Sequence, residues 1–107
     1  MEKPNLEYIE KLSRGNESIR NELINVIKTE YPNELKKYHI SAKNIDFKQI
    51  EDIVHRIKHK FSILGLEKSY NKANNFEKSL REHRLDDAQK EYFENILEVI
   101  SQFLKTI

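Results

Sequence analysis

The sequence contains no cysteine, only two glycines and two prolines, and almost no net charge. Without cysteine the chain has no disulfide scaffold, no thiolate metal site and no thiol nucleophile. Because 19 basic and 18 acidic residues nearly cancel to a formal charge of +1, no strong overall field attracts a nucleic acid or an anionic membrane. The apolar runs are too short for a signal peptide or a membrane span. We therefore expect a soluble cytoplasmic protein that binds neither nucleic acid nor membrane.

A chain of 107 residues is large enough to bury one core and too small for two, so we expect a single domain over residues 1–107. Charged residues make up 35% of the sequence, yet large aliphatic and aromatic residues are frequent enough to drive folding. We expect a monomer. Met1 and the lack of a linker favour a free-standing protein over a piece of a larger one.

Long segments repeat apolar residues every three or four positions, and little of the sequence alternates like a strand, which predicts an all-α fold. Helices are expected over residues 5–13, 16–40, 46–64 and 66–81, and a last helix is expected to start at a cap on Asp86 or Asp87. We expect Pro32 to kink the second helix without dividing it. Short loops between the four long helices predict an antiparallel up-down-up-down four-helix bundle, with the short first helix covering one end.

The second helix is expected to bury one apolar face. This face comprises Ile19, Leu23, Val26, Ile27, Tyr31, Leu35 and Tyr38. Residue spacings of three and four place these side chains on one broad side of a helix.

Both ends of the third helix carry clear signals. Asp46 is predicted to cap its start, with Gln49 completing a capping-box-like pair and Ile45 packing as a hydrophobic staple. At the other end, Gly65 suits the left-handed position just past a helix, and Leu66 can contact the preceding turn as in a Schellman motif.

His55 stands out on this third helix because it points away from the apolar side. The apolar residues of the helix are Phe47, Ile50, Val54, Ile57, Phe61 and Leu64. On a helical wheel His55 lies about 140° from the centre of that stripe, with Lys58, His59 and Ser62 around it. A histidine in this position does not serve packing, so we expect it to be exposed.

The stretch 54–58, followed by Gly65 ten residues after His55, resembles the signature of histidine-containing phosphotransfer (HPt) domains. Residues 73–77 resemble the small-x-x-apolar-Glu pattern of the next helix in that family, although Glu77 could also pair with a basic neighbour in a purely structural role. The resemblance implies that His55, through Nε2, receives a phosphoryl group from a receiver-domain aspartate and passes it on in a multistep two-component phosphorelay. The partners it implies are response regulator receiver domains and the receiver domain of a hybrid histidine kinase.

The chemistry of the residues around His55 is compatible with a phosphohistidine carrier. An exposed imidazole is largely unprotonated in cytoplasm and can attack a phosphoryl donor. Lys58, one turn further on, is expected to contact the phosphoryl oxygens, and Ser62 to donate a weaker hydrogen bond. We find no glycine-rich phosphate loop and no aspartate cluster for magnesium, so the chain is not expected to be an enzyme with a kinase site or to bind a cofactor.

The surface around His55 is expected to dock the receiver domain. Glu51, Asp52, His59 and Ile63 are the docking residues that we expect there. His59 occupies a position that is often glycine in the family, where a side chain could crowd the partner. Alternatively, the basic run 58–60 adds positive charge for an acidic receiver face.

A second departure from the family is Ser69, where an apolar residue is common. We expect Tyr70 to compensate for it in the packing.

Two other functions remain open on the sequence alone. His55 and His59 are four residues apart on a helix, a spacing that can hold a divalent metal, with Glu51 or Asp52 as a further ligand. A zinc site of the familiar helical type would have glutamate after the first histidine, where this chain has Arg56. The other alternative is a non-catalytic helical interaction module in which His55 is an ordinary surface residue.

Overall fold

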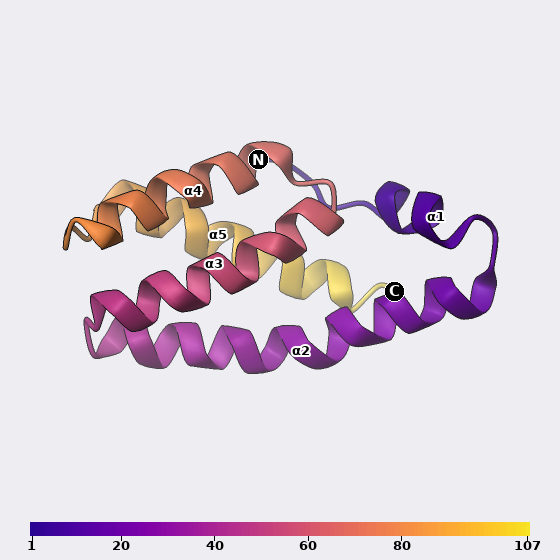
Figure 1. The fold of residues 1–107 in the computed structure, drawn as a ribbon, viewed down its shortest axis with the longest axis horizontal. Helices are drawn as coiled ribbons and strands as arrows, with labels where there is room; N and C mark the ends of the chain where they lie inside the picture. Colours follow the sequence, from indigo (N-terminus) through magenta and orange to yellow (C-terminus); the bar gives the residue numbers. More distant parts are fainter.

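Five helices and no strand make up the fold in the computed structural model, which describes residues 1–107 (Figure 1). The helices are α1 (Glu7–Ser13), α2 (Glu17–Lys43), α3 (Phe47–Ile63), α4 (Glu67–Arg81) and α5 (Asp87–Leu104). The all-α prediction is therefore confirmed. As predicted, α2 continues without a break through Pro32. None of the helices combines the length and the hydropathy that a membrane crossing requires.

The four long helices lie lengthwise beside one another and form a bundle (Figure 1). α3 packs against both α2 and α4, α5 packs against α4, and α1 packs against α2. Two buried tyrosines of α2 also reach α5: the Tyr31 hydroxyl donates to the Leu97 carbonyl at 2.7 Å, and the Tyr38 hydroxyl donates to the Glu94 carboxylate at 2.9 Å. Burial raises the pKa of both phenols, so they remain neutral hydrogen-bond donors at physiological pH.

A single hydrophobic core of 20 buried residues joins all five helices. Phe93 of α5 is at its centre, with its ring centroid 5.1 Å from Tyr38, 5.6 Å from Phe61 and 5.4 Å from Phe76. Tilted aromatic contacts at these distances are favourable beyond the burial of apolar area alone. The core therefore fixes α3 rigidly against α4, and these two helices carry the candidate site.

The predicted cap residues are confirmed, but Gln49 does not complete a capping box, because the Asp46 N–H donates to the Ser41 carbonyl at 3.2 Å. The side chains of Asn16, Asp46 and Asp86 accept hydrogen bonds from the third backbone N–H of α2, α3 and α5, at 3.1, 3.0 and 2.9 Å. At the end of α3, the Leu66 N–H donates to the Phe61 carbonyl at 2.8 Å while Gly65 adopts φ +77°. This is the Schellman geometry expected from Gly65.

Two details of the predicted packing are wrong. Ile45 does not form a staple, because its backbone turns into the left-handed region at φ +50° and its side chain is 58% exposed. On α2, Ile19 and Val26 are exposed, whereas Ile24, which was not in the predicted face, is buried. α2 carries two apolar lines that diverge around the helix, and only one of them meets the core.

Residues that precede α1 fasten the turn between α3 and α4. The Asn5 N–H donates to the Leu64 carbonyl at 2.9 Å, and Glu2 accepts hydrogen bonds from the Lys68 and Ser69 N–H groups at 2.9 and 2.8 Å. Partial burial raises the pKa of Glu2, but these hydrogen bonds outweigh that effect and hold its pKa below the usual value. Glu2 thus stabilises the start of α4 in place of a local cap.

The two glycines offer a matched test of this contact. Gly15 and Gly65 have nearly the same positive φ, +79° and +77°, but a Cβ at Gly65 would lie 2.6 Å from the Asn5 amide, whereas a Cβ at Gly15 would meet nothing within 4 Å. We expect Gly15→Ala to lower the free energy of unfolding by about 1 kcal/mol through backbone strain alone, and Gly65→Ala to lower it by about 2–3 kcal/mol. Urea unfolding measures both. Equal losses of unfolding free energy in Gly15→Ala and Gly65→Ala would show that the Asn5 side chain can move away from the added methyl group without cost.

Candidate functional site

His55 is exposed on the outer side of α3, as predicted. Its side chain retains 58% of its accessible surface, while its neighbours Val54 and Ile57 on the same helix are fully buried. The buried neighbours hold the backbone of α3 in place, so the position of the imidazole is set by a packed helix rather than by a loop.

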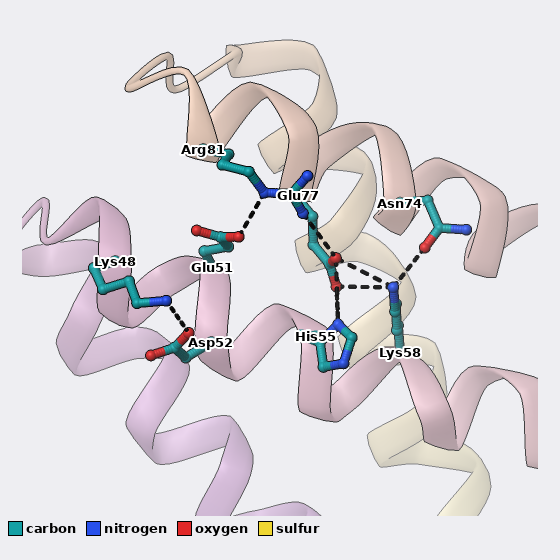
Figure 2. A network of polar contacts seen from close by, with 8 residues as sticks. All are labelled: Lys48, Glu51, Asp52, His55, Lys58, Asn74, Glu77 and Arg81. Carbon is teal, nitrogen blue, oxygen red and sulfur yellow. Dashed lines mark hydrogen bonds and ion pairs between the residues drawn. The ribbon is translucent and has the colours of Figure 1, made fainter.

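A carboxylate from α4 orients the His55 ring. Nδ1 of His55 lies 3.1 Å from Oε1 and 3.4 Å from Oε2 of Glu77 (Figure 2). An ionised carboxylate only accepts hydrogen bonds, so we infer that Nδ1 carries a proton and donates a hydrogen bond to Glu77. The lone pair of the neutral ring is then on Nε2.

Lys58 is not at the surface as expected, but buried behind His55. Its side chain is 8% exposed, and its Nζ donates to Asn74 at 2.6 Å and to Glu77 at 3.2 Å. The Lys58 Nζ also lies 5.4 Å from the centroid of the Tyr70 ring. The long Lys58 side chain extends between α3 and α4 and places its charge there. A helical wheel gives only the direction of the Cα–Cβ bond, so it does not show where the end of a long side chain lies.

Glu77 is the centre of the network that joins α3 and α4 (Figure 2). Its side chain is only 5% exposed, and it contacts His55, Lys58 and, more distantly, Arg81 at 3.9 Å. A buried carboxylate is tolerated only when it is paired and hydrogen-bonded, and Lys58 supplies the compensating charge. Glu77 therefore has a structural role and also contacts His55.

Two further ion pairs flank the network on the outer turn of α3. Arg81 Nε donates to Glu51 at 2.9 Å, and Lys48 Nζ lies 3.1 Å from Asp52. The hydrogen bond to Glu51 raises the pKa of Arg81, and the hydrogen bond to Asp52 raises the pKa of Lys48. Glu51 and Asp52, both expected to dock a partner, are thus already engaged with basic residues of the chain itself.

His59 lies beside His55 on the exposed side of α3. Its ring meets the His55 ring edge to face, with centroids 5.0 Å apart. Ser62 is exposed two turns beyond His55 and makes no side-chain hydrogen bond. Ile63, expected to be a docking residue, is half-buried against the core.

The basic run 58–60 does not form a positive surface. Lys60 is buried on the side of α3 that faces α2, where its Nζ lies 3.0 Å from Glu30 and 2.8 Å from Glu34. Since Lys58 is neutralised by Glu77 on the opposite flank, only His59 of this run faces solvent.

The ligand set suggested for a metal is not assembled. No group of three or more histidine, aspartate or glutamate side chains converges in a way that could hold an ion. His55 and His59 lie close together, but the carboxylates of Glu51 and Asp52 are bound to Arg81 and Lys48.

Ser69 is accommodated by polar contacts. It is fully buried, its hydroxyl donates to Glu2 at 2.9 Å and lies 3.1 Å from the Tyr92 hydroxyl, and its backbone N–H is bound by Glu2. Tyr70 was expected to fill the space of the missing apolar side chain, and it is partly buried against the core. The Ser69 hydroxyl is accommodated mainly by its hydrogen bonds to Glu2 and Tyr92.

Neither the place of Asn74 in the site nor the contact between Glu77 and His55 was predicted from the sequence. Asn74, Glu77 and Arg81 are spaced three and four residues apart, so they share the side of α4 that faces α3. That polar spacing on an otherwise amphipathic helix was the available signal.

The site as a whole presents the exposed His55 ring on a packed helix, with its Nδ1 beside the buried Glu77–Lys58 pair. Comparison of the chain with protein-family models, with curated proteins and with solved structures gave no match.

Proposed function

We propose that this protein is a histidine phosphotransfer protein that accepts and donates a phosphoryl group at His55. The observation that carries the proposal is the contact between Glu77 and Nδ1 of His55, which leaves Nε2 as the nucleophile on an exposed ring. In this proposal the four long helices form the antiparallel up-down-up-down bundle of a single HPt domain, with α1 covering one end. The protein acts in the cytoplasm.

The transfer step needs little from the chain beyond this geometry. The Nε2 lone pair attacks the phosphorus of an aspartyl phosphate, the bond between phosphorus and the aspartate oxygen breaks, and the aspartate leaves as a carboxylate. The ring gains positive charge as the N–P bond forms, while Nδ1 keeps its proton. Glu77, 3.1 Å from Nδ1, stabilises that charge, and the reverse step regenerates the neutral ring.

Lys58 has a different role in this proposal from the one that the sequence suggested. In the unphosphorylated protein it neutralises Glu77 and bonds to Asn74, so it holds the carboxylate that orients the ring. Lys58 is thus a positioning residue in the resting state. Ser62 is free to donate a hydrogen bond to the phosphoryl group.

The partners in this proposal are the receiver domains of response regulators and of a hybrid histidine kinase, which supply the phosphorylated aspartate and its magnesium ion. They approach the outer face of α3 and the shallow groove between α2 and α3. This groove is lined by Lys37, Ile40, Ser41, Gln49, Asp52, Ile53 and Arg56. Two basic and two apolar residues stand against a single acidic one, Asp52, in this lining, which suits an acidic partner with a partly apolar surface.

A transfer assay tests the proposal directly. When the purified protein is mixed with phosphorylated receiver domains, we expect an acid-labile, base-stable phosphoryl group on the wild type and on His59→Gln, and none on His55→Gln. Both histidines are exposed neighbours on α3, so the two variants differ only in whether the ring held by Glu77 is removed. Normal labelling of His55→Gln, or no labelling of the wild type by a panel of receivers, would contradict the proposal. A wild type that binds receivers without labelling would indicate an interaction module.

A further inference from the structure

The outer surface of α2 carries a line of exposed apolar side chains at a spacing of seven residues. Ile19, Val26 and Ile40 are 43%, 46% and 51% exposed, and they account for three of the seven large hydrophobic residues exposed in the protein. Asn33 occupies the remaining position of this seven-residue series. The series forms one narrow apolar line along the helix, which a second helix could cover.

Charge is distributed unevenly along the same helix. Beside the apolar line, the amino-terminal half is acidic at Glu22 and the carboxyl-terminal half is basic at Lys36, Lys37 and Lys43. Neither Glu22 nor Lys36 forms an ion pair within the chain. Two unpaired charges of opposite sign therefore lie on the exposed face of one helix.

We infer that this face of α2 binds the same face of a second copy of the chain in an antiparallel, two-fold arrangement. With the axis between Thr29 and Glu30, residue numbers that sum to 59 face each other. Ile19 then meets Ile40 of the second copy, Val26 meets Asn33, and Glu22 lies beside Lys36 on the same flank of the contact, each pair occurring twice. A parallel pairing would instead place the lysines of one copy beside those of the other, which is unfavourable.

The interface is small, so the dimer is weak. α2 is 27 residues long and spans about 40 Å, but only three apolar side chains per copy contribute. We expect a dissociation constant between about 10 µM and 1 mM, in the range of small transient interfaces.

The dimer has one consequence that rests on the proposed function. Ile40 belongs both to this face and to the groove between α2 and α3 next to the proposed docking surface. A second copy on α2 would then compete with a receiver domain. The dimer itself does not depend on phosphotransfer, so its test is separate.

Sedimentation equilibrium with charge-swapped variants tests the pairing. We expect Glu22→Lys and Lys36→Glu each to raise the dissociation constant by about threefold to tenfold, and the double variant to restore it, because the swapped pair attracts again. Val26→Lys should raise it by at least about tenfold, whereas Leu12→Lys, an equally exposed residue on α1, should leave it unchanged. A wild type that stays monomeric at about 1 mM, or a double variant weaker than either single variant, would overturn the inference.

Because the chain has no cysteine, disulfide crosslinking reports the orientation. Mixed Ile19→Cys and Ile40→Cys proteins should form the mixed disulfide dimer and little of either homodimer. Preferential crosslinking of Ile19→Cys to itself and of Ile40→Cys to itself would indicate a parallel pairing and overturn the inference. All these positions are exposed, so circular dichroism should show an unchanged fold.

Discussion

Replacing Glu77 with alanine is expected to lower the free energy of unfolding by about 3–5 kcal/mol, the usual loss when one partner of a buried ion pair is removed. Lys58 would keep its place in the α3–α4 contact with only Asn74 to bind its charge, since its side chain is 8% exposed and cannot reach bulk water without disturbing the packing. The His55 ring would also lose the carboxylate that orients it. We therefore expect slower phosphotransfer at temperatures where the variant is still folded.

Glu51→Ala is the matched control. Glu51 also accepts a hydrogen bond from a cation on α4, Arg81, but the arginine side chain is 62% exposed. An ion pair of this kind contributes about 0–1 kcal/mol, so the loss should be small. Urea unfolding of both variants measures the contrast. If both variants lost only a little free energy of unfolding, the Lys58 charge would be solvated in Glu77→Ala, and the Glu77–Lys58 pair would contribute little to stability.

The sequence was sufficient to predict α3 and its ends, because local signals decide them. The spacing of Ile50, Val54 and Ile57 defines one buried side, Asp46 caps the start, and Gly65 supplies the left-handed turn. The exposure of His55 follows from the same spacing. Each of these features depends on residues within one or two turns of one another.

The contacts of the site could not be predicted in the same way. Lys58 and Lys60 are both polar residues at the edges of the apolar stripe, and only the positions of α4 and α2 determine that each lysine meets a glutamate. The partners are distant in sequence, 19 residues for Glu77 and 26 for Glu34. Ile19 and Val26 of α2 were predicted to be buried for a related reason. They fit a helical spacing as well as the buried residues of α2 do, and only packing against the other helices determines which apolar line is covered.

A comparison of Lys58 and Lys60 distinguishes an effect on stability from an effect on phosphotransfer, because both lysines are equally buried, on opposite sides of α3. We expect Lys58→Met and Lys60→Met each to lower the free energy of unfolding by about 3–5 kcal/mol, since each leaves a buried carboxylate without its main partner. Glu34 is the clearer case: apart from Lys60, its Oε1 has no hydrogen-bond partner. Adding Glu34→Leu to Lys60→Met should therefore recover most of the loss.

The two variants should differ in phosphotransfer. Lys60 contacts Glu30 and Glu34 on the α2 side and touches nothing that holds His55, so folded Lys60→Met should label at the wild-type rate. Lys58 fixes the carboxylate that orients His55, so Lys58→Met should form phosphohistidine about tenfold more slowly or lose it about tenfold faster. Both rates are measured below the unfolding temperature of the less stable variant. Equal labelling of the two would mean that the Glu77–Lys58 pair serves only to hold α4 against α3, and that the exposed imidazole reacts without its help.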